Sequence, residues 1–252
     1  MSIQANQHSG TAYLTCTLLP VPHGMFLRAG GTSTGELAGL NLSSTVGDQP
    51  ERVAANRNLA LQALGLRHLI SARQVHGDRI LHARPEHRDT EQDGYDAIIS
   101  TLPDTALLIQ QADCQGLLLA APQKAVIAAI HCGWRGSVCN IIATTVQVLH
   151  RDYGVQPATL RAVISPSLGP CCAEFVNYLR ELPEWMHAFQ VRPNYFDFWA
   201  ISQRQLIDAG LLPEHIEAAR RCTRCDERFF SYRRAAQTGR NGSLIGLAPH
   251  TR

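Results

Sequence analysis

The middle of the chain holds a series of short apolar runs, and no other feature constrains the fold as strongly. The runs are Leu69–Arg73, Ile80–Ala83, Ala97–Ser100, Ala106–Gln110, Gly116–Ala120 and Ala125–Ile130. Each has the length of a strand, and only a few polar residues separate the last three, as expected of neighbouring buried strands. The middle of the chain is therefore predicted to be rich in β-structure.

The segments on either side of this region add helices and further strands. Residues 51–64 have apolar side chains at roughly helical spacing, with Asp48 as a candidate N-cap and Gly65 at the end. Other helices are expected over residues 137–149, 174–189 and 199–209, and other strands over residues 13–28, 161–164, 229–232 and 243–247. Strands and helices alternate without a strict βαβ order. The prediction is an α/β fold, a single layered domain over residues 1–252 with mixed β-sheets flanked by helices.

The composition excludes several classes of partner. A chain of 252 residues with 45% hydrophobic content can bury a substantial core. The formal net charge is only +2 and there is no dense lysine run, so a nucleic acid is not an expected partner. No apolar run approaches the roughly 20 residues that span a bilayer, so no membrane partner is expected either.

The cysteines indicate a reducing compartment. Eight cysteines in a chain of this length do not make a disulfide scaffold. The first ten residues lack the basic start and the apolar stretch of a secretory signal. We therefore expect a cytoplasmic protein whose thiols are reduced and available as metal ligands.

Three segments far apart in the chain each carry a side chain that prefers a soft or borderline metal ion. They provide His76 in Gln-Val-His-Gly, Cys114 in Ala-Asp-Cys, and His131 in His-Cys-Gly-Trp-Arg-Gly. Two imidazoles and one thiolate suit zinc or copper, and three protein ligands leave one tetrahedral position for water or substrate. If the three side chains meet, the sequence predicts a catalytic metal site.

Each of these residues also has a simpler interpretation. His76 alone would usually be a surface histidine, and Cys114 between apolar runs would usually be a small buried hydrophobe. His131 is the most specific signal, since it ends an apolar strand and opens a glycine-containing loop that leads into a helix. Asp113 could orient a ligating imidazole or pair with an arginine. Arg135 could bind a phosphate or carboxylate, or form a surface ion pair.

The remaining cysteines have no clear place in this site. Cys132 should point to the opposite face of its strand from the predicted ligand, so it is not expected to bind the metal. Cys171, Cys172, Cys222 and Cys225 could supply a four-thiolate structural zinc site. Adjacent cysteines rarely bind one metal together, and the Cys-x-x-Cys motif has no second copy, so a second metal site is disfavoured.

A stretch near the C-terminus is rich in arginine and hydroxyl groups. Residues 229–240 include Arg233 and could close a pocket around an anionic or hydroxylated substrate. The alternative is an ordinary solvated closing strand.

Many short motifs occur in a fixed order along the chain. They are Arg28–Ser33, Leu40–Leu42, Gly47-Asp48 with Asn56-Arg57, Gln74–Gly77, Ala112–Cys114, His131–Gly136, Pro166–Cys172, Phe230–Arg234 and Thr238–Arg240. This series resembles the laccase-domain, or polyphenol-oxidase-like, proteins, a family usually described as purine nucleoside phosphorylases with adenosine deaminase activity. The resemblance covers most of the chain.

The resemblance implies a fold and a metal site. The family fold is a layered α/β domain with mixed sheets, and its metal ligands correspond to His76, Cys114 and His131. Its metal is usually zinc, with copper in some members. The chain departs from the family pattern at Cys132, where alanine is common, and at residues 173–176, where a Tyr-Glu-Val-Gly-like segment is common.

The resemblance also implies an activity. It is phosphorolysis of adenosine, inosine and methylthioadenosine to the free base and ribose 1-phosphate, with hydrolytic deamination of adenosine. The expected partners are a purine nucleoside and phosphate, for a monomer or small homo-oligomer. In this interpretation Arg135 binds phosphate with Arg233 as a second candidate, and Asp113 orients a ligand or shuttles a proton.

Three alternatives remain open. Copper-dependent phenol oxidation is disfavoured, because the chain has only three methionines and no His-x-His pair for a multi-copper cluster. A second alternative makes Cys114 a nucleophile, activated by His76 or His131, in a hydrolase that edits cell-wall precursors. A purely structural zinc site, the third, requires a fourth protein ligand.

Overall fold

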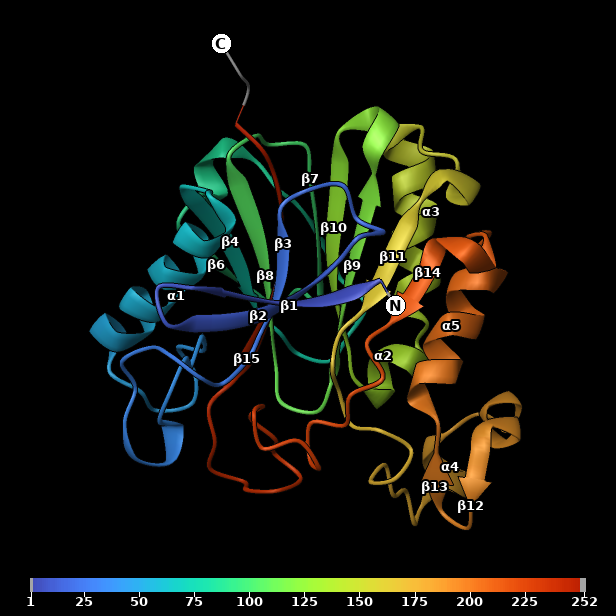
Figure 1. Cartoon of the computed structure of the whole chain (residues 1–252). Helices are drawn as coiled ribbons and strands as arrows, with labels where there is room; N and C mark the ends of the chain where they lie inside the picture. Colours follow the sequence, from blue (N-terminus) through green and yellow to red (C-terminus); the bar gives the residue numbers. More distant parts are fainter. Residues whose placement is uncertain (1, 250–252) are drawn as a thin grey trace.

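The computed structural model describes residues 2–249, and its centre is a pair of β-sheets packed face to face (Figure 1). The order of the seven-stranded sheet is β1 (Ile3–His8), β2 (Thr11–Cys16), β3 (His23–Phe26), β15 (Asn241–Leu247), β8 (Thr105–Gln111), β4 (His68–Arg73) and β6 (Thr90–Asp93). The order of the six-stranded sheet is β14 (Ile216–Ala218), β11 (Arg161–Ile164), β9 (Gln115–Ala121), β10 (Val126–Cys132), β7 (Ala97–Ser100) and β5 (Ile80–His82). A separate pair consists of β12 (Gln190–Arg192) and β13 (Tyr195–Phe196).

Both large sheets are mixed, as predicted. Strand β4 runs parallel to β8 and β6, whereas β15 runs antiparallel to β3 and β8. In the six-stranded sheet, β9 runs antiparallel to β10 and β11, and β5 runs parallel to β7.

The apolar runs in the middle of the chain do form fully buried strands. Strands β8, β9 and β10 are buried along their whole lengths, and Ile109, Leu118 and Ile127 share one core between the sheets. The expectation that all three strands are neighbours is wrong, because β8 belongs to the seven-stranded sheet and β9 and β10 to the other. The chain crosses between the sheets at residues 112–114, so Cys114 lies at the junction.

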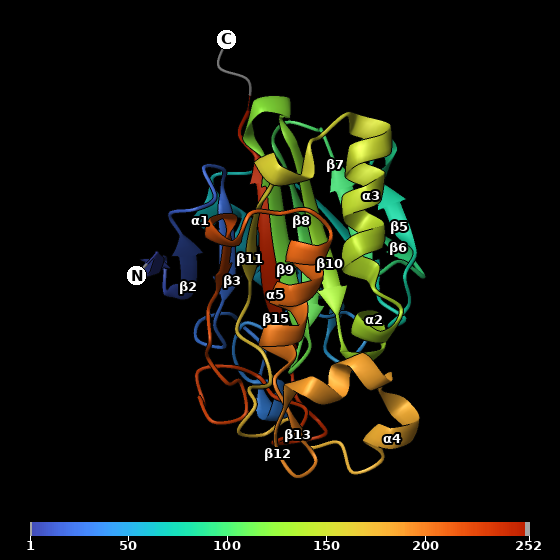
Figure 2. The same cartoon turned by 90° about the vertical axis from the view of Figure 1, so that its right-hand side faces the viewer.

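Helices cover the outer faces of both sheets. Helix α1 (Pro50–Leu64) packs on the seven-stranded sheet, with Leu61 in one cluster with Leu108. Helices α3 (Ile141–Tyr153) and α5 (Phe198–Asp208) cover the six-stranded sheet (Figures 1 and 2). The resulting order of layers, helix, sheet, sheet and helices, confirms the predicted layered α/β fold. Every helix in the described part of the chain is too short or insufficiently apolar to cross a membrane.

The ends of α1 agree only in part with the sequence prediction. Gly65 ends the helix in the left-handed conformation, with φ of 67°, as the pattern indicated. Asp48 is not the N-cap, because that position belongs to Gln49 and no side chain caps the helix there. The Asp48 carboxylate instead accepts hydrogen bonds from Ser33 Oγ at 2.6 Å and Asn41 Nδ2 at 2.8 Å.

Two of the other predicted helices are interrupted. The segment 137–149 contains the end of α2 (Trp134–Val138) and the start of α3, which are separated at Asn140. Asn140 has a φ of 57° and its side chain accepts a hydrogen bond from the N–H of Ala143 at 3.2 Å. It therefore stops one helix and caps the next.

The largest error concerns residues 174–189, where the sequence indicated one long helix. The structure has a single turn, α4 (Tyr178–Glu181), followed by a 3-10 helix over Glu184–Phe189. Pro183 lies between them, and proline disfavours helical backbone at the residue that precedes it. Residues 229–232 form no strand but an irregular loop that leads into a turn, with the two phenylalanines buried.

Candidate functional site

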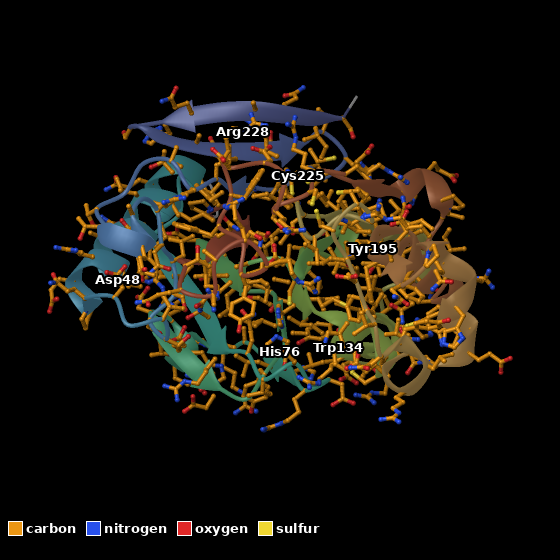
Figure 3. The ribbon with its side chains drawn as sticks, turned by 90° about the horizontal axis from the view of Figure 1, so that it is seen from below. Asp48, His76, Trp134, Tyr195, Cys225 and Arg228 are labelled. Carbon is orange, nitrogen blue, oxygen red and sulfur yellow. The ribbon has the colours of Figure 1, made fainter. Side chains whose placement is uncertain are left out.

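The three predicted ligands lie together at one end of the paired sheets. His76 follows β4, Cys114 lies between β8 and β9, and His131 is near the end of β10. Their donor atoms all lie within 4.8 Å of one another, and Sγ of Cys114 is 3.9 Å from Nε2 of His76. The two imidazole rings meet edge to face, with centroids 4.7 Å apart. Figure 3 shows this end of the molecule, with His76 and Trp134 near one edge and Cys225 nearer the opposite edge.

Unusual backbone conformations shape this end of the sheets. His76 and Asp113 have φ values of 61° and 86°, in the left-handed region that side chains other than glycine rarely adopt. Gly133 leaves space for the ligands, because a Cβ there would lie 2.9 Å from Sγ of Cys114 and 3.1 Å from Cδ2 of His76. Strained turns and one close approach therefore bring the three donors together.

A buried carboxylate holds two of the candidate ligands in place. Oδ1 of Asp96 accepts hydrogen bonds from Nδ1 of His131 at 2.8 Å and from the backbone N–H of His76 at 2.9 Å. Oδ2 accepts from the backbone N–H groups of Gly77 at 2.8 Å and Val75 at 3.2 Å. With Nδ1 of His131 donating to Asp96, its Nε2 is the nitrogen that would lose its proton and bind a metal ion.

Cys114 and His131 shift each other's pKa. Burial by itself raises the pKa of Cys114, but the charge of His131 and hydrogen bonds from both histidines lower it to about 6. Burial lowers the pKa of His131, whereas the Cys114 thiolate and the Asp96 carboxylate raise it to about 9. The thiolate form of Cys114, which is the form that binds metal, is therefore favoured near neutral pH.

This donor set fits a zinc or copper ion. The separation of the donor atoms, within 4.8 Å, is on the order of twice a metal–ligand bond of ~2.0–2.3 Å. Among residues 2–249, no fourth histidine, cysteine, aspartate or glutamate joins the group. Three protein ligands would leave a coordination position open, as in catalytic rather than closed structural sites.

The three ligands line a cavity of about 510 Å³, a size typical of small-molecule sites. Its wall combines positive charge with aromatic rings. The residues that contribute these groups are Arg73, Arg135, Arg233, Arg240, Trp134, Phe175, Phe198 and Tyr232. The cavity can therefore offer guanidinium groups to an anion and flat apolar surfaces to a ring.

Asp113 lies in this cavity, and both of its carboxylate oxygens accept hydrogen bonds from the C-terminal part of the chain. Its Oδ1 accepts a hydrogen bond from Thr223 Oγ1 at 2.6 Å, and its Oδ2 accepts one from the backbone N–H of Arg233 at 2.6 Å. The expectation that Asp113 orients a ligating imidazole is therefore wrong, and Asp96 does so instead. Asp113 ties the C-terminal loop to the junction between the sheets.

The two predicted arginines both line the cavity. Arg135, on α2, is exposed, and its guanidinium carbon lies 4.7 Å from the ring centre of Trp134. Trp134 in turn meets Phe175 edge to face at 6.2 Å. The guanidinium of Arg233 donates to the backbone oxygen of Cys172 at 3.2 Å. The alternative, in which Arg233 belongs to an ordinary closing strand, is wrong, because the structure, which describes all of residues 219–240, has no strand between β14 and β15.

Sequence reasoning missed Asp96, and it included Arg240 only within the stretch over residues 229–240. Asp96 directly precedes a buried strand, and a carboxylate in that position requires partners, so a signal was present. Arg240 lines the cavity and donates to the backbone oxygen of Thr238 at 2.7 Å. Burial lowers the pKa of Arg240, although the charges of Cys114 and Asp113 act in the opposite direction.

The N-terminal motifs build a polar network next to the cavity. The side chain of Asn56 donates to Ser33 Oγ at 2.8 Å and to the backbone oxygen of Asn41 at 2.9 Å. These contacts fix the loop over residues 28–48, from which Ser43 reaches the cavity wall. The motifs are therefore needed for the shape of the site and not only for the core.

The comparison with known proteins agrees with this geometry. A family model described as multi-copper polyphenol oxidoreductase laccase matches residues 22–248. The chain belongs to this family. Among its relatives, the purine nucleoside phosphorylase of Deinococcus radiodurans is 35% identical over 253 residues, which cover 94% of each chain. The purine nucleoside phosphorylase YlmD of Geobacillus stearothermophilus is 29% identical over 266 residues, covering 95% of this chain and 96% of the relative.

Solved structures of the family share the fold. The hypothetical protein YfiH of Bacillus licheniformis superposes with a TM-score of 0.88 at 28% identity, covering 96% of this chain and 98% of the other. YlmD of Geobacillus stearothermophilus also gives 0.88, at 26% identity, covering 98% and 99%. The family resemblance and the α/β fold expected from the sequence are both confirmed.

Proposed function

We propose that this member of the laccase-like family is a zinc-dependent purine nucleoside phosphorylase, and that residues 1–252 act as one domain. In this proposal, adenosine, inosine and methylthioadenosine react with phosphate to give the free base and ribose 1-phosphate, and adenosine is also deaminated by water. One observation carries the proposal: two imidazoles and a thiolate within 4.8 Å of one another line a cavity that also holds arginines and aromatic rings. The names of the relatives support the class of substrate.

His76, Cys114 and His131 are the residues that would hold the ion. Zinc is preferred because catalytic zinc sites combine three histidine, cysteine or carboxylate ligands with one open position, and copper satisfies the same donors. A bound divalent ion supplies Lewis-acid chemistry at the open end of this donor set. Asp96 keeps the His131 ring oriented for this role.

Phosphorolysis requires positive charge around the attacking phosphate. A phosphate oxygen forms a bond to C1′ of the ribose while the bond from C1′ to the base nitrogen breaks, and the electron pair leaves with the base. We assign phosphate binding to Arg135 and Arg240, which both line the cavity, with Arg233 as a further candidate. The departing base takes up a proton that comes from the attacking phosphate or from water, and we assign its relay to Asp113, the sole carboxylate among the described residues that line the cavity.

Binding of the base is assigned to the aromatic wall. Trp134, Phe175 and Tyr232 line the cavity, and flat rings of this kind pack well against a purine. This wall is also where the chain departs from the family pattern, since Phe175 lies within residues 173–176. We assign substrate preference to this segment.

The proposal is tested with protein purified anaerobically and analysed for metal. Adenosine is incubated with and without phosphate, and adenine, ribose 1-phosphate and inosine are separated and measured. Adenine and ribose 1-phosphate should form only with phosphate, whereas inosine should form in both reactions. The same protein stripped of metal should form none of these three products.

Other results would support the alternatives instead. A copper-loaded protein that oxidises phenols but leaves adenosine unchanged would overturn the proposal in favour of phenol oxidation. Nucleoside turnover that survives removal of the metal would also overturn it. In that case, rapid alkylation of Cys114 by iodoacetamide at low pH would identify a thiolate nucleophile.

A further inference from the structure

Four cysteines outside the cavity meet at a second point. Cys171 and Cys172 come from the loop after β11, and Cys222 and Cys225 come from the loop after β14. Their sulfur atoms all lie within 4.8 Å of one another. Sγ of Cys225 is 3.4 Å from that of Cys172 and 3.7 Å from that of Cys171. Figure 3 shows Cys225 with further sulfur atoms gathered beside it.

From this geometry we infer a second metal site, in which Cys171, Cys172, Cys222 and Cys225 bind one zinc ion as four thiolates. A tetrahedral ion with four Zn–S bonds of ~2.3 Å places its sulfurs about 3.8 Å apart. The measured separations of 3.4 and 3.7 Å are close to this value. No open coordination position remains, so the site is structural. It does not rest on the proposed function, because it shares no ligand with the cavity.

The backbone brings the two loops together without any metal. Ser167 accepts and donates main-chain hydrogen bonds with the second loop, from Thr223 N at 3.0 Å and to Arg221 O at 3.1 Å. Gly169 allows a close approach, because a Cβ there would lie 3.0 Å from Cβ of Cys222. The four thiols are therefore held near one another by the fold, and the ion would find its ligands already assembled.

The adjacent cysteines, which the sequence disfavoured as joint ligands, lie in a tight turn. The backbone oxygen of Gly169 accepts hydrogen bonds from the N–H groups of Cys172 at 2.9 Å and Ala173 at 3.0 Å. This turn lets both sulfurs approach Cys225. A disulfide accounts for the cluster less well, because one S–S bond of ~2.05 Å would leave two thiols of the four without a role.

Arginines surround the cluster and match its charge. Four thiolates and one Zn²⁺ carry a net charge of −2, which requires nearby positive groups when water is partly excluded. Arg192 donates to the backbone oxygen of Cys171 at 3.0 Å, and Arg233 donates to that of Cys172 at 3.2 Å. Arg234 donates to the backbone oxygen of Thr223 at 2.9 Å. These contacts place guanidinium groups at the backbone of both loops that carry the four sulfurs.

The ion would also hold one wall of the cavity in a fixed position. Thr223, between Cys222 and Cys225, donates to the carboxylate of Asp113 at 2.6 Å. Arg233 contacts both Asp113 and the backbone of Cys172. Joining the two loops through a metal therefore fixes residues that face the substrate, although the ion itself does not contact it.

The test is metal stoichiometry in anaerobically purified protein. Wild-type protein should contain two zinc ions per chain. The double variant Cys222→Ser/Cys225→Ser should lose the ion of the four cysteines and retain the ion in the cavity. Cys114→Ser should lose the ion in the cavity and retain the ion of the four cysteines. Cys139→Ser removes an exposed thiol outside both groups and should keep two ions. A wild-type protein with one ion per chain, or a double variant with unchanged metal content, would overturn the inference.

Cobalt substitution gives a readout that does not depend on the variants folding. Wild-type protein loaded with Co²⁺ should show the intense charge-transfer bands of a four-sulfur tetrahedral site, and Cys114→Ser should retain them. Absence of these bands from the wild-type protein overturns the inference. So does a disulfide among the four cysteines, detected by mass spectrometry of the anaerobic protein.

Discussion

The carboxylate of Asp96 accepts a hydrogen bond from Nδ1 of His131 at 2.8 Å, and the side chains of both residues are almost completely buried. Asp96 directly precedes β7, and His131 lies near the end of β10, the antiparallel neighbour of β7. The same carboxylate also accepts three backbone hydrogen bonds from the loop that carries His76. One buried side chain thus controls the position of two candidate metal ligands.

Replacing Asp96 with asparagine should weaken metal binding. The amide nitrogen would face N–H donors that now point at a carboxylate oxygen, so the loop and the His131 ring both lose a fixed partner. Zinc affinity should fall ~10–100-fold, the usual effect of losing a partner of a ligating histidine. The measurement is competition with a chelator of known affinity. Asp208→Asn, at an exposed carboxylate on α5, is the control, and equal affinities in the two folded variants would contradict the assignment.

Replacing Cys114 with alanine should remove the catalytic metal and the turnover. The expected loss of activity exceeds the ~10–100-fold typical of outer partners, because a ligand itself is lost. Far-ultraviolet circular dichroism should be unchanged, since Cys114 lies at the junction between strands and not within one. Cys139→Ala is the matched control. Retained release of adenine by the Cys114 variant would count against the model.

Replacing Gly133 with alanine should disturb the same centre by crowding. The new methyl group would lie 2.9 Å from Sγ of Cys114 and 3.1 Å from Cδ2 of His76, so both side chains must move. We expect at least a tenfold loss of zinc affinity, comparable with the ~10–100-fold effect of disturbing the ligand surroundings. Gly77→Ala is a strict control, because its methyl group would meet no atom closer than 3.6 Å. Equal affinities in the two variants would show that Gly133 is not needed for the ligand geometry.

Replacing Arg135 with alanine should act mainly on phosphate. Loss of one guanidinium contact should raise the KM for phosphate on the order of tenfold, with a smaller change in the KM for the nucleoside. Initial rates over a grid of both substrates separate the two effects. Arg204→Ala, at an exposed arginine on α5 that pairs with Asp208, is the control. A change confined to the nucleoside would assign Arg135 to the base or ribose instead.

The charge of the Glu91 carboxylate should stabilise the folded protein at neutral pH. This stabilisation should be lost as the pH falls below the ordinary pKa of glutamate. Burial alone raises the pKa of Glu91, but a hydrogen bond from Ser44 and the charge of Arg57, 2.8 Å away, lower it overall. Because the folded-state pKa is depressed, the stabilisation is complete above the unfolded-chain value of ~4.3 and is lost as pH falls through the folded value.

The test for Glu91 compares urea unfolding of wild type and Glu91→Gln across pH. At neutral pH the substitution should cost about 1–3 kcal/mol, because Arg57 and Gln110 lose a charged acceptor. The difference should shrink as the pH falls from ~6 toward ~3. Glu86→Gln, at an exposed residue, should show almost no difference at any pH. A constant difference for Glu91 would mean that its charge does not contribute.

The buried central strands could be predicted well, whereas the edge strands β1, β6 and β14 and the loops could not, for a physical reason. Apolar runs such as Leu117–Ala121 report burial directly, and Gly65 reports a helix end through its backbone freedom. Residues 174–189 have similar local propensity for a helix, but Pro183 interrupts them and Phe175, Tyr178 and Phe196 contact one another through the tertiary fold. Packing outweighs propensity there.

The sequence by itself determined which chemistry was present: two imidazoles and a thiolate in recognisable motifs, and apolar runs that must be buried. Only the tertiary structure decided which polar groups meet, because partners such as Asp96 and His131, 35 residues apart, are selected by strand pairing and not by spacing. The same holds for Asp113, whose partners lie 110 and 120 residues away, and for the four cysteines. A side chain's type is local information, whereas its neighbours depend on how the sheets pair and pack.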